Sequence, residues 1–451
     1  MKINNMKSFV FDKWYLGNFI PNCINSNILN FLFQNNLLDK ELHILSFELE
    51  KNFSNLHSIW YSNLGLKTIL LEQKQYNSEL TDWIYPIEPW GHLMYSLNVE
   101  AKDEYQNFFD RIPTKIIEDV NNDKGKIVIN YSHEGWVSDW LLKGFYLGAK
   151  NKNIKFENII LILNDFNLEN KLKTFLEKYD ITKYPKVINY SFFLTASSKH
   201  FFEKHFNNNL ELKHNTHKNN KFLFLNRRLD LHRVKLMCEI FDTIHNNSII
   251  SFDKKLITNE VKNFLINNNL SEKFDNLPQK VIADREDIQN TNGYQHENEF
   301  LYLDSYISIV TETSFYNDND FISEKIWKPM YQFHPIIVVG RPHLLKYLKD
   351  IGFKTFNWLI NEDYDNIEDN DKRMEFIIYE IKRLNKYSLK DIHEIIQNNF
   401  DDLLHNYNLM NFFGKNIHKI ESKLLKHFDI TNLQYTDIYK EIKLDYDEKI
   451  I

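Results

Sequence analysis

The sequence predicts an α/β protein built from two doubly wound parallel sheets that face each other across a cleft. Between about residues 80 and 200, short apolar runs alternate with stretches that have the pattern of amphipathic helices. A polar stretch without any apolar residue, 213–220, interrupts this alternation, which then starts again. Each block has about the size of a Rossmann domain, and such sheets bind ligands outside the carboxyl ends of their strands.

The first block contains the elements of a parallel sheet with a crossover helix. Runs rich in Ile, Val and Leu predict strands at 126–131, 158–163 and 186–190. Residues 169–178 place Leu172, Phe175 and Leu176 on one face, which is typical of an amphipathic helix. The first 80 residues are rich in aromatic side chains, but no pattern assigns an element to them.

The second block repeats this organisation after the polar stretch. We expect strands at 221–226, 305–310 and 335–339, and helices at 231–241, 323–331 and 343–349. Pro329 should kink or shorten the middle helix. From about residue 372 the periodicity is helical. The sequence therefore predicts an N-terminal domain (1–212), a linker (213–220), a second domain (221–400) and a C-terminal helical tail (401–451).

Composition narrows the class of protein. The chain has 55 Lys and Arg against 62 Asp and Glu, a net charge of -7, which argues against a dedicated nucleic-acid binder. Cys23 and Cys238 are too few for a cysteine-based zinc site or a disulfide framework. No apolar run approaches the roughly 20 residues of a transmembrane helix, and the first residues lack a signal-peptide core. We therefore expect a soluble, cytoplasmic protein with no nucleic-acid partner.

One candidate anion site lies where the helix expected at 323–331 begins. Ser323 is a favourable N-cap residue, so the free N–H groups and positive dipole end of the helix would face the preceding loop. Lys325 in the first turn opposes the helix dipole unless an anion compensates it. A diphosphate would do so, and Glu324 could accept hydrogen bonds from ribose hydroxyls. The alternative is a capped surface helix without a ligand.

A second cationic segment follows the strand expected at 221–226. Arg227, Arg228 and Arg233 lie just beyond its carboxyl end, where α/β sheets bind ligands. The planar guanidinium forms bidentate, charge-assisted bonds with phosphate. The alternative is a solvated helix start in which Arg228 and Asp230 form a surface pair.

Residues 305–340 resemble the C-terminal signature of the α-1,3-fucosyltransferases. In that signature a strand leads to Glu-Asn-Ser, and a loop with Tyr/Phe-x-Thr-Glu-Lys precedes a helix and a Pro-Val-x-x-Gly strand. The matching segments here are Glu312-Thr-Ser314, Phe321-Ile-Ser323-Glu324-Lys325 and Pro335-Ile-Ile-Val-Val-Gly340. Thr313 replaces the family's Asn and Ser323 its Thr. Residues 226–233 are similar to the family's strand end, which an arginine follows at the start of a helix.

This resemblance implies a GT-B-like fold, with an acceptor-side Rossmann-like domain at 1–212 and a donor-binding one at 221–400. It implies inverting transfer of fucose from GDP-fucose without a bound metal or other cofactor. By carry-over of the motif, Arg233 and Lys325 would hold the donor diphosphate, Glu324 the ribose, and Glu312 the sugar end. Asn226, Arg228 and Ser323 complete the expected donor-binding set.

Inverting transfer also needs a general base that removes the proton of the acceptor hydroxyl. Residues 132–136, Ser-His-Glu-Gly-Trp, follow the strand expected at 126–131. They resemble the family's Gly-Glu-Asn-type loop, which carries the catalytic glutamate. We expect Glu134 to be the base, with His133 as its nearest substitute. The alternative is that both residues cap the following helix.

The sequence thus predicts a fucosyltransferase-like enzyme whose partners are a GDP-sugar and a glycan acceptor. Asp318 and Asp320 have the Asp-x-Asp form of metal-dependent transferases, but chance matches are common in a chain rich in Asn and Asp, and no metal is expected. One alternative is transfer from another nucleotide sugar to DNA or protein. Another is a catalytically inactive nucleotide-sugar-binding module, because Thr313 and Trp327 to Pro329 depart from the family pattern.

Overall fold

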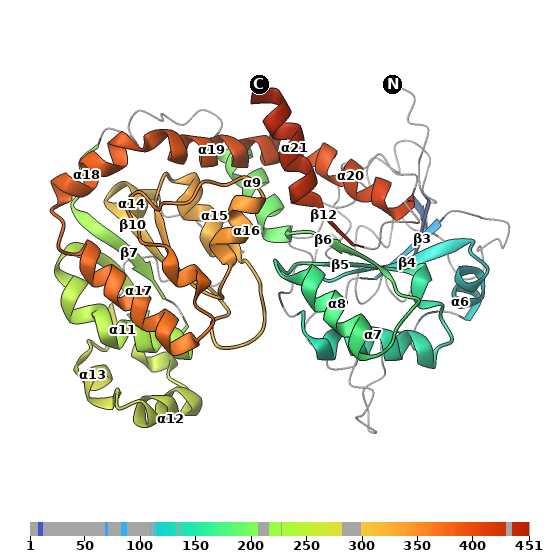
Figure 1. Cartoon of the computed structure of the whole chain (residues 1–451), viewed down its shortest axis with the longest axis horizontal. Coiled ribbons are helices and arrows are strands. Elements are labelled where there is room, and N and C mark those ends of the chain that lie inside the picture. Colours follow the sequence, from blue (N-terminus) through green and yellow to red (C-terminus); the bar gives the residue numbers. More distant parts are fainter. Residues whose placement is uncertain are drawn as a thin grey trace, which may run out of the picture. The chain divides into compact units, whose positions relative to one another are not determined.

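A computed structural model of the chain divides into two compact units (Figure 1). Unit 1 consists of Met1–Phe192 and Asn416–Glu441, and unit 2 of Phe193–Lys415 and Ile442–Ile451. The structure describes residues 8–11, 68–70, 83–87, 109, 112, 114–132, 135, 137–205, 216–226, 228–281, 299–429 and 435–450. Structural statements below concern these residues.

Unit 1 is built on a seven-stranded sheet in which every described pairing is parallel. The strands, in spatial order, are β12 (Tyr435–Asp437), β6 (Lys186–Asn189), β5 (Ile159–Leu163), β4 (Gly125–Asn130), β3 (Trp83–Ile87), β1 (Ser8–Phe11) and β2 (Thr68–Leu70). Its helical elements are α6 (Thr114–Asn121), α7 (Asp139–Asn151), η3 (Phe156–Asn158), α8 (Leu168–Lys178), α20 (Ile417–Asp429) and the start of α21 (Ile438–Ile450).

Apolar patterning accounts for the core of unit 1. All five residues of β5 are buried, as a strand covered on both faces requires. Helix α8 buries Leu168, Leu172 and Phe175 and exposes its polar face. Helix α7 begins after Ser138, whose side chain accepts a hydrogen bond from the N–H of Leu141. Helices α7 and α8 pack side by side (Figure 1).

Unit 2 contains a five-stranded sheet in the order β11-β10-β7-β8-β9. The first four strands are parallel and β9 is antiparallel to β8. The strands are β7 (Asn220–Leu225), β8 (Ser248–Asp253), β9 (Lys280–Val281), β10 (Ser305–Thr311) and β11 (Ile336–Val339). All residues of β10 and β11 are buried, which places these strands in the core.

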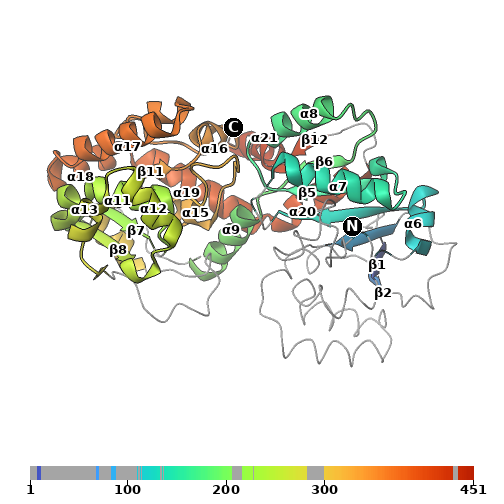
Figure 2. The same ribbon diagram turned by 90° about the horizontal axis from the view of Figure 1, so that it is seen from below.

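Helices cover the unit 2 sheet, and α11 and α17 pack against each other (Figure 2). The helical elements are α9 (Phe192–His205), α11 (Leu231–Ile244), η4 (His245–Asn247), η5 (Lys254–Leu256), α12 (Asn259–Asn267), α13 (Ser271–Asn276), α14 (Glu299–Leu303), α15 (Glu324–Tyr331), α16 (Leu344–Asp350), η8 (Asp363–Asn366), α17 (Asn370–Leu384), α18 (Leu389–Asn398) and α19 (Phe400–Lys415). Pro329 lies inside α15, which nevertheless extends to Tyr331, the end expected from the sequence.

The chain thus has the predicted α/β class, with two Rossmann-type units and C-terminal helices. The units differ in extent from the predicted domains, because α9 groups with unit 2 and the tail divides between both units. Within that tail, β12 joins the edge of the unit 1 sheet beside β6, which helical periodicity does not predict. The linker expected at 213–220 lies partly outside the described residues, and Asn220 already begins β7.

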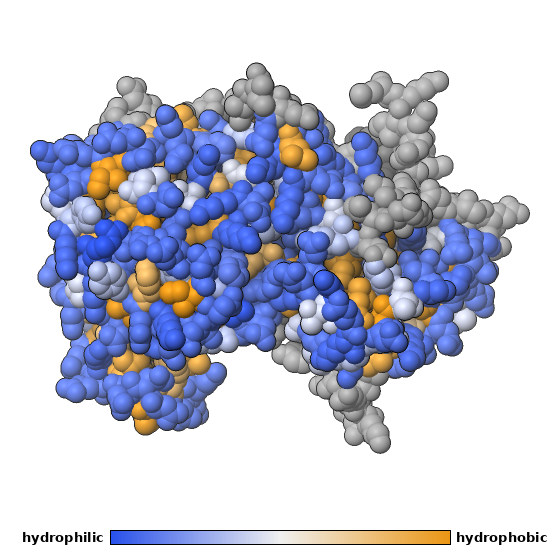
Figure 3. Space-filling model, in the orientation of Figure 1, coloured by the Kyte–Doolittle hydropathy of each residue, from blue (hydrophilic) through white to orange (hydrophobic). Residues whose placement is uncertain are grey.

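Among the described residues, no helix is long and apolar enough to cross a membrane. On the face shown in Figure 3, hydrophilic residues predominate and the hydrophobic ones are scattered between them.

Candidate functional site

The sequence-predicted donor residues of unit 2 lie at the carboxyl ends of two neighbouring strands. Asn226 follows β7, and its N–H donates to the carbonyl of Ser251 (2.8 Å). Glu312 follows β10, and its N–H donates to the carbonyl of Val339 (3.0 Å). These bonds extend the parallel pairing by one residue and fix both positions. This edge is where open α/β sheets bind ligands.

The Asn226 side chain is buried with one donor unused. Its Oδ1 accepts a hydrogen bond from Thr311 Oγ1 (2.7 Å), which ties the ends of β7 and β10 together. Its Nδ2 is buried and has no hydrogen-bond partner within the part of the chain that the structure describes. A buried amide donor without a partner is costly, so it is a candidate contact for a ligand acceptor.

Arg233 in the first turn of α11 is only 4% exposed. One terminal nitrogen donates to the carbonyls of Thr311 and Glu312 (3.3 Å each), and the other forms an ion pair with Asp230 (3.3 Å). Its Nε is buried and has no hydrogen-bond partner among the described residues. Burial lowers the pKa of Arg233 from its ordinary value, but a guanidinium stays protonated in proteins. This cation therefore has one donor left for a ligand.

Arg228, by contrast, has an exposed side chain. Its guanidinium forms an ion pair with the Asp230 carboxylate, with 3.4 Å between nitrogen and oxygen. This is the Arg228–Asp230 pair of the alternative interpretation, in which the segment is a solvated helix start. Asp230 therefore faces two arginines, one buried and one exposed.

His232 was not among the predicted site residues, yet it is buried beside them. Because the backbone oxygen of Glu312 can only accept, His232 Nε2 donates to it (2.9 Å). The imidazole stacks on Phe315 at 5.6 Å between ring centroids. Burial and the charge of Arg233 lower the pKa of His232 to about 3, so the ring is neutral near pH 7. It orders the chain after β10 without adding a charge.

Glu312 joins the end of β10 to the start of α15. Its carboxylate is fully buried and accepts hydrogen bonds from the N–H groups of Thr313 (3.1 Å) and Ser323 (3.3 Å). Burial raises the pKa of Glu312, and the charge of Lys325 opposes that rise. The carboxylate therefore fixes the loop that leads into the helix.

Lys325 and Glu324 lie at the N-terminus of α15. Ser323 caps the helix by accepting from the N–H of Lys325 (3.3 Å). The ammonium of Lys325 donates to the hydroxyls of Ser323 (3.0 Å) and Thr313 (3.2 Å) and lies 3.8 Å from the Glu324 carboxylate. Burial alone would raise the pKa of Glu324, but the charges of Lys325 and Lys328 lower it overall, so this carboxylate is ionised at neutral pH.

Glu312 joins the two segments, because its carbonyl accepts from Arg233 and its carboxylate accepts from the N–H of Ser323. The charges of Arg233 and Glu324 shift each other's pKa, and that of Lys325 acts on Glu312 and His232. The structure thus brings together Asn226, Arg233, Glu312, Ser323, Glu324 and Lys325, which are up to about a hundred residues apart in sequence.

Arg373 on α17 supports this site, although no sequence signal pointed to it. Its side chain is 1% exposed and stacks over Phe315 at 4.5 Å. It donates to the carbonyls of Phe315, Gly340, Ile367 and Glu368 and to Asn370 Oδ1. Burial lowers the pKa of Arg373 to about 10, so it remains a cation at neutral pH. One side chain thus fixes the loops after β10 and β11.

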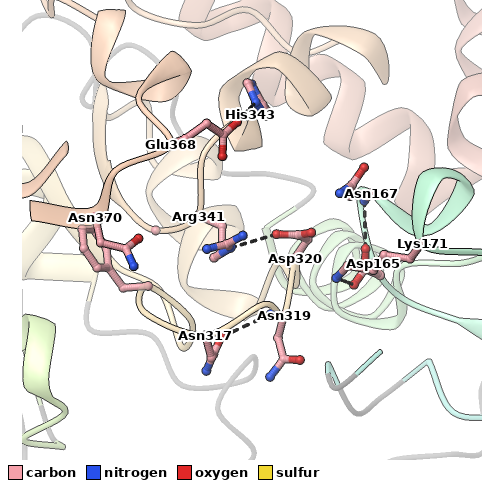
Figure 4. Close-up of polar contacts among 12 residues, drawn as sticks. Asp165, Asn167, Lys171, Asn317, Asn319, Asp320, Arg341, His343, Glu368 and Asn370 are labelled. Atoms are coloured by element: carbon pink, nitrogen blue, oxygen red, sulfur yellow. Dashed lines mark hydrogen bonds and ion pairs between the residues drawn. The ribbon is translucent and has the colours of Figure 1, made fainter. Parts of the chain in front are cut away.

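No group of three or more His, Cys, Asp or Glu residues in the described part of the chain could hold a metal ion. Of the Asp-x-Asp pair, Asp320 is buried and accepts a hydrogen bond from Arg341 Nε at 3.0 Å (Figure 4). Its carboxylate thus has a cation partner from the chain itself.

The predicted base Glu134 and its substitute His133 lie outside the described residues. The neighbouring carboxyl ends of unit 1 carry polar pairs. Asn130 Oδ1 accepts from the hydroxyl of Ser132 (2.8 Å), and Asp165 forms an ion pair with Lys171 (Figure 4). The assignment of the base stays a prediction.

No family model matches the sequence, and no curated protein matches it. Solved structures similar to the chain include two trehalose-phosphate synthases. One is an α,α-trehalose 6-phosphate synthase from Burkholderia multivorans, with 8% identity, a TM-score of 0.38, and coverage of 87% of this chain and 78% of that one. The other is a UDP-forming α,α-trehalose-phosphate synthase from Burkholderia vietnamiensis, with 10% identity, a TM-score of 0.40, and coverage of 94% and 99%.

Proposed function

We propose that this chain is an inverting glycosyltransferase that takes a GDP-activated sugar, fucose by the resemblance of its motifs, and transfers it to a hydroxyl of a glycan acceptor. The observation that carries the proposal is the pair of buried, unused donors, Arg233 Nε and Asn226 Nδ2, in the same site as Lys325.

The unused donors favour an anionic ligand. A buried donor without an acceptor costs about 1–3 kcal/mol, which phosphate oxygens would offset. Lys325 gives a second reason, because a cation in the first turn opposes the dipole of α15. A diphosphate bound here would accept a hydrogen bond from Arg233 Nε. Its negative charge would also offset the unfavourable interaction of the Lys325 ammonium with the helix dipole.

The same groups suit departure of a nucleoside diphosphate. As the sugar bond breaks, negative charge develops on the leaving phosphate, and preorganised cations stabilise it. Arg233 and Lys325 would supply that stabilisation, and the ionised Glu324 would accept hydrogen bonds from ribose hydroxyls. Glu312 would line the sugar end. In the proposed reaction Glu134 removes the proton of the acceptor hydroxyl as its oxygen attacks the anomeric carbon.

Calorimetric titration with GDP, UDP, ADP and CMP in the absence of added metal tests the donor site. We expect GDP-selective binding that Lys325→Ala loses and Lys390→Ala retains. Lys390 is a matched control because its side chain is 79% exposed on α18 of the same unit. Selective binding of UDP, or binding that requires a divalent metal, would contradict the GDP assignment.

A turnover assay separates an enzyme from a binding module. GDP-fucose is incubated with a panel of glycan acceptors, and both transfer and donor hydrolysis are measured. We expect transfer that Glu134→Gln abolishes while GDP affinity is unchanged. Saturable GDP binding with neither transfer nor hydrolysis would mean that the chain binds nucleotide sugars without catalysis.

A further inference from the structure

A pocket of about 590 Å³ lies in unit 2 among α16, the segment 357–366 and the end of α17. None of the candidate donor residues lines it. Its volume is within the range of small-molecule sites, about 300–1,000 Å³. It is therefore large enough for a ligand of its own.

The wall of this pocket is held in place by buried interactions. Glu380 is fully buried and accepts from the N–H of Asn361 (2.7 Å), while Arg383 binds both Glu380 and the carbonyl of Leu359 (2.7 Å). Glu362 accepts from the N–H of Phe356 and the hydroxyl of Thr355 (2.8 Å). A wall fixed in this way loses little conformational entropy when a ligand binds.

The charges that line the pocket are largely compensated within the protein. Arg383 is neutralised by Glu380, and Lys349 lies 3.1 Å from Glu362. The Asp365 carboxylate accepts from the N–H groups at the start of α16. Lys346 adds one positive charge to the lining and Asp363 one negative charge, so these two balance. The pocket therefore lacks the surplus of cations that a phosphate ligand would require and suits an uncharged one.

Two kinds of side chain in the lining remain available to a ligand. Asn357 and Asn366 make no side-chain hydrogen bonds within the described part of the chain, and amides both donate to and accept from hydroxyls. Trp358 and Tyr387 add aromatic surface, although the Arg383 guanidinium lies over one face of the Tyr387 ring at 5.6 Å and donates to its hydroxyl (3.1 Å). The Trp358 indole is held in position by its bond to Asp402 (3.1 Å). Aromatic faces pack against the C–H groups of sugars while amides bind the hydroxyls.

We propose that this pocket binds a neutral carbohydrate at a site separate from the donor site. Two amides, two aromatic side chains and a rigid wall without surplus charge are the features that carry this inference. It does not depend on the proposed transfer reaction.

The test is a glycan array probed with the labelled full chain, followed by calorimetry with the strongest neutral glycan. We expect binding that persists in the presence of saturating GDP and in Lys325→Ala. The variant Asn357→Ala/Asn366→Ala should weaken it about tenfold or more, because two hydrogen bonds are lost. The control Asn267→Ala/Asn276→Ala changes two exposed amides of the same unit outside the pocket and should bind normally.

Three results would overturn the proposal. The first is the absence of any neutral glycan binding by a chain shown to be folded. The second is binding that survives in Asn357→Ala/Asn366→Ala, and the third is binding that disappears in Lys325→Ala, since either would place the glycan elsewhere. GDP affinity is measured separately, so failure here is distinguishable from failure of the proposed function.

Discussion

The two edges of the unit 2 sheet hold their cations in different ways. At the amino edge, Lys218 donates to the carbonyls of Tyr302 (2.9 Å) and Ser305 (2.7 Å), and its ammonium lies 5.5 Å from the centre of the Tyr306 ring. At the carboxyl edge, Arg233 also bonds to two carbonyls but keeps a buried Nε to which no described residue bonds. The first cation is satisfied by the fold, whereas the second still has a donor for a ligand.

The largest effect is expected from Arg233. Replacing it by Met removes the guanidinium that would bind a diphosphate. Removing one partner of a buried charged contact lowers the binding free energy by about 2–5 kcal/mol. We expect Arg233→Met to weaken GDP binding about a hundredfold, measured by calorimetry on protein whose folding is confirmed by circular dichroism. Arg228→Gln is the control, because its side chain is 73% exposed, and it should change affinity little. If Arg233→Met bound GDP as tightly as wild type, the cation at the carboxyl edge would not bind the ligand, and the two edges would not differ in this respect.

The amino-edge cation should matter for stability instead. Lys218→Met leaves two carbonyls without their donor, which should lower the free energy of unfolding by about 2 kcal/mol. Urea unfolding measures this loss. The affinity of the folded variant for GDP should stay within a factor of two of wild type. A Lys218→Met protein with the free energy of unfolding of wild type but a weaker affinity for GDP would contradict this, because it would place Lys218 in ligand binding and not in stability.

A smaller effect is expected from the cap of α15. Ser323→Ala removes the acceptor of the Lys325 N–H and of its ammonium, so stability should fall by about 1 kcal/mol. Ser323→Thr keeps the hydroxyl and should recover most of the loss in thermal unfolding. If Ser323→Thr were no more stable than Ser323→Ala, the hydroxyl oxygen of Ser323 would not be the source of the stabilisation.

The smallest effect should depend on pH. The pKa of Glu324 is lowered in the folded state, so its ionised form stabilises the protein above the ordinary pKa of a glutamate. That contribution is lost as the pH falls through the lowered pKa. We therefore expect Glu324→Gln to be less stable than wild type at neutral pH, with the difference vanishing in acid. Urea unfolding at a series of pH values measures it, and a difference that grows in acid would reverse the assigned direction.

Sequence patterning was sufficient for the elements that lead to the site. The strands expected at 221–226, 305–310 and 335–339 lie within one or two residues of β7, β10 and β11. Ser323 also caps α15 as expected. These features depend on local periodicity and on residues close in sequence, which is why they could be predicted.

The contacts that complete the site could not be predicted in the same way. The bond from Thr311 to Asn226 joins residues 85 positions apart, and the bonds of Arg373 reach Phe315 across 58. Such pairs depend on how strands and loops align in space. Whether a donor such as Arg233 Nε is left without a partner depends on all of its neighbours at once. The sequence identified Arg233 as a candidate, but only the three-dimensional arrangement shows that its Nε lacks a partner among the described residues.

The return of the chain to unit 1 has a consequence for biosynthesis. Strand β6 emerges from the ribosome before any part of unit 2, whereas its neighbour β12 is made only after residues 193–415 of unit 2. Until then β6 is an unprotected sheet edge, and such edges pair readily with strands of other chains. A nascent or truncated chain that stops before residue 435 should therefore be prone to aggregation even though all residues of the donor site have been made.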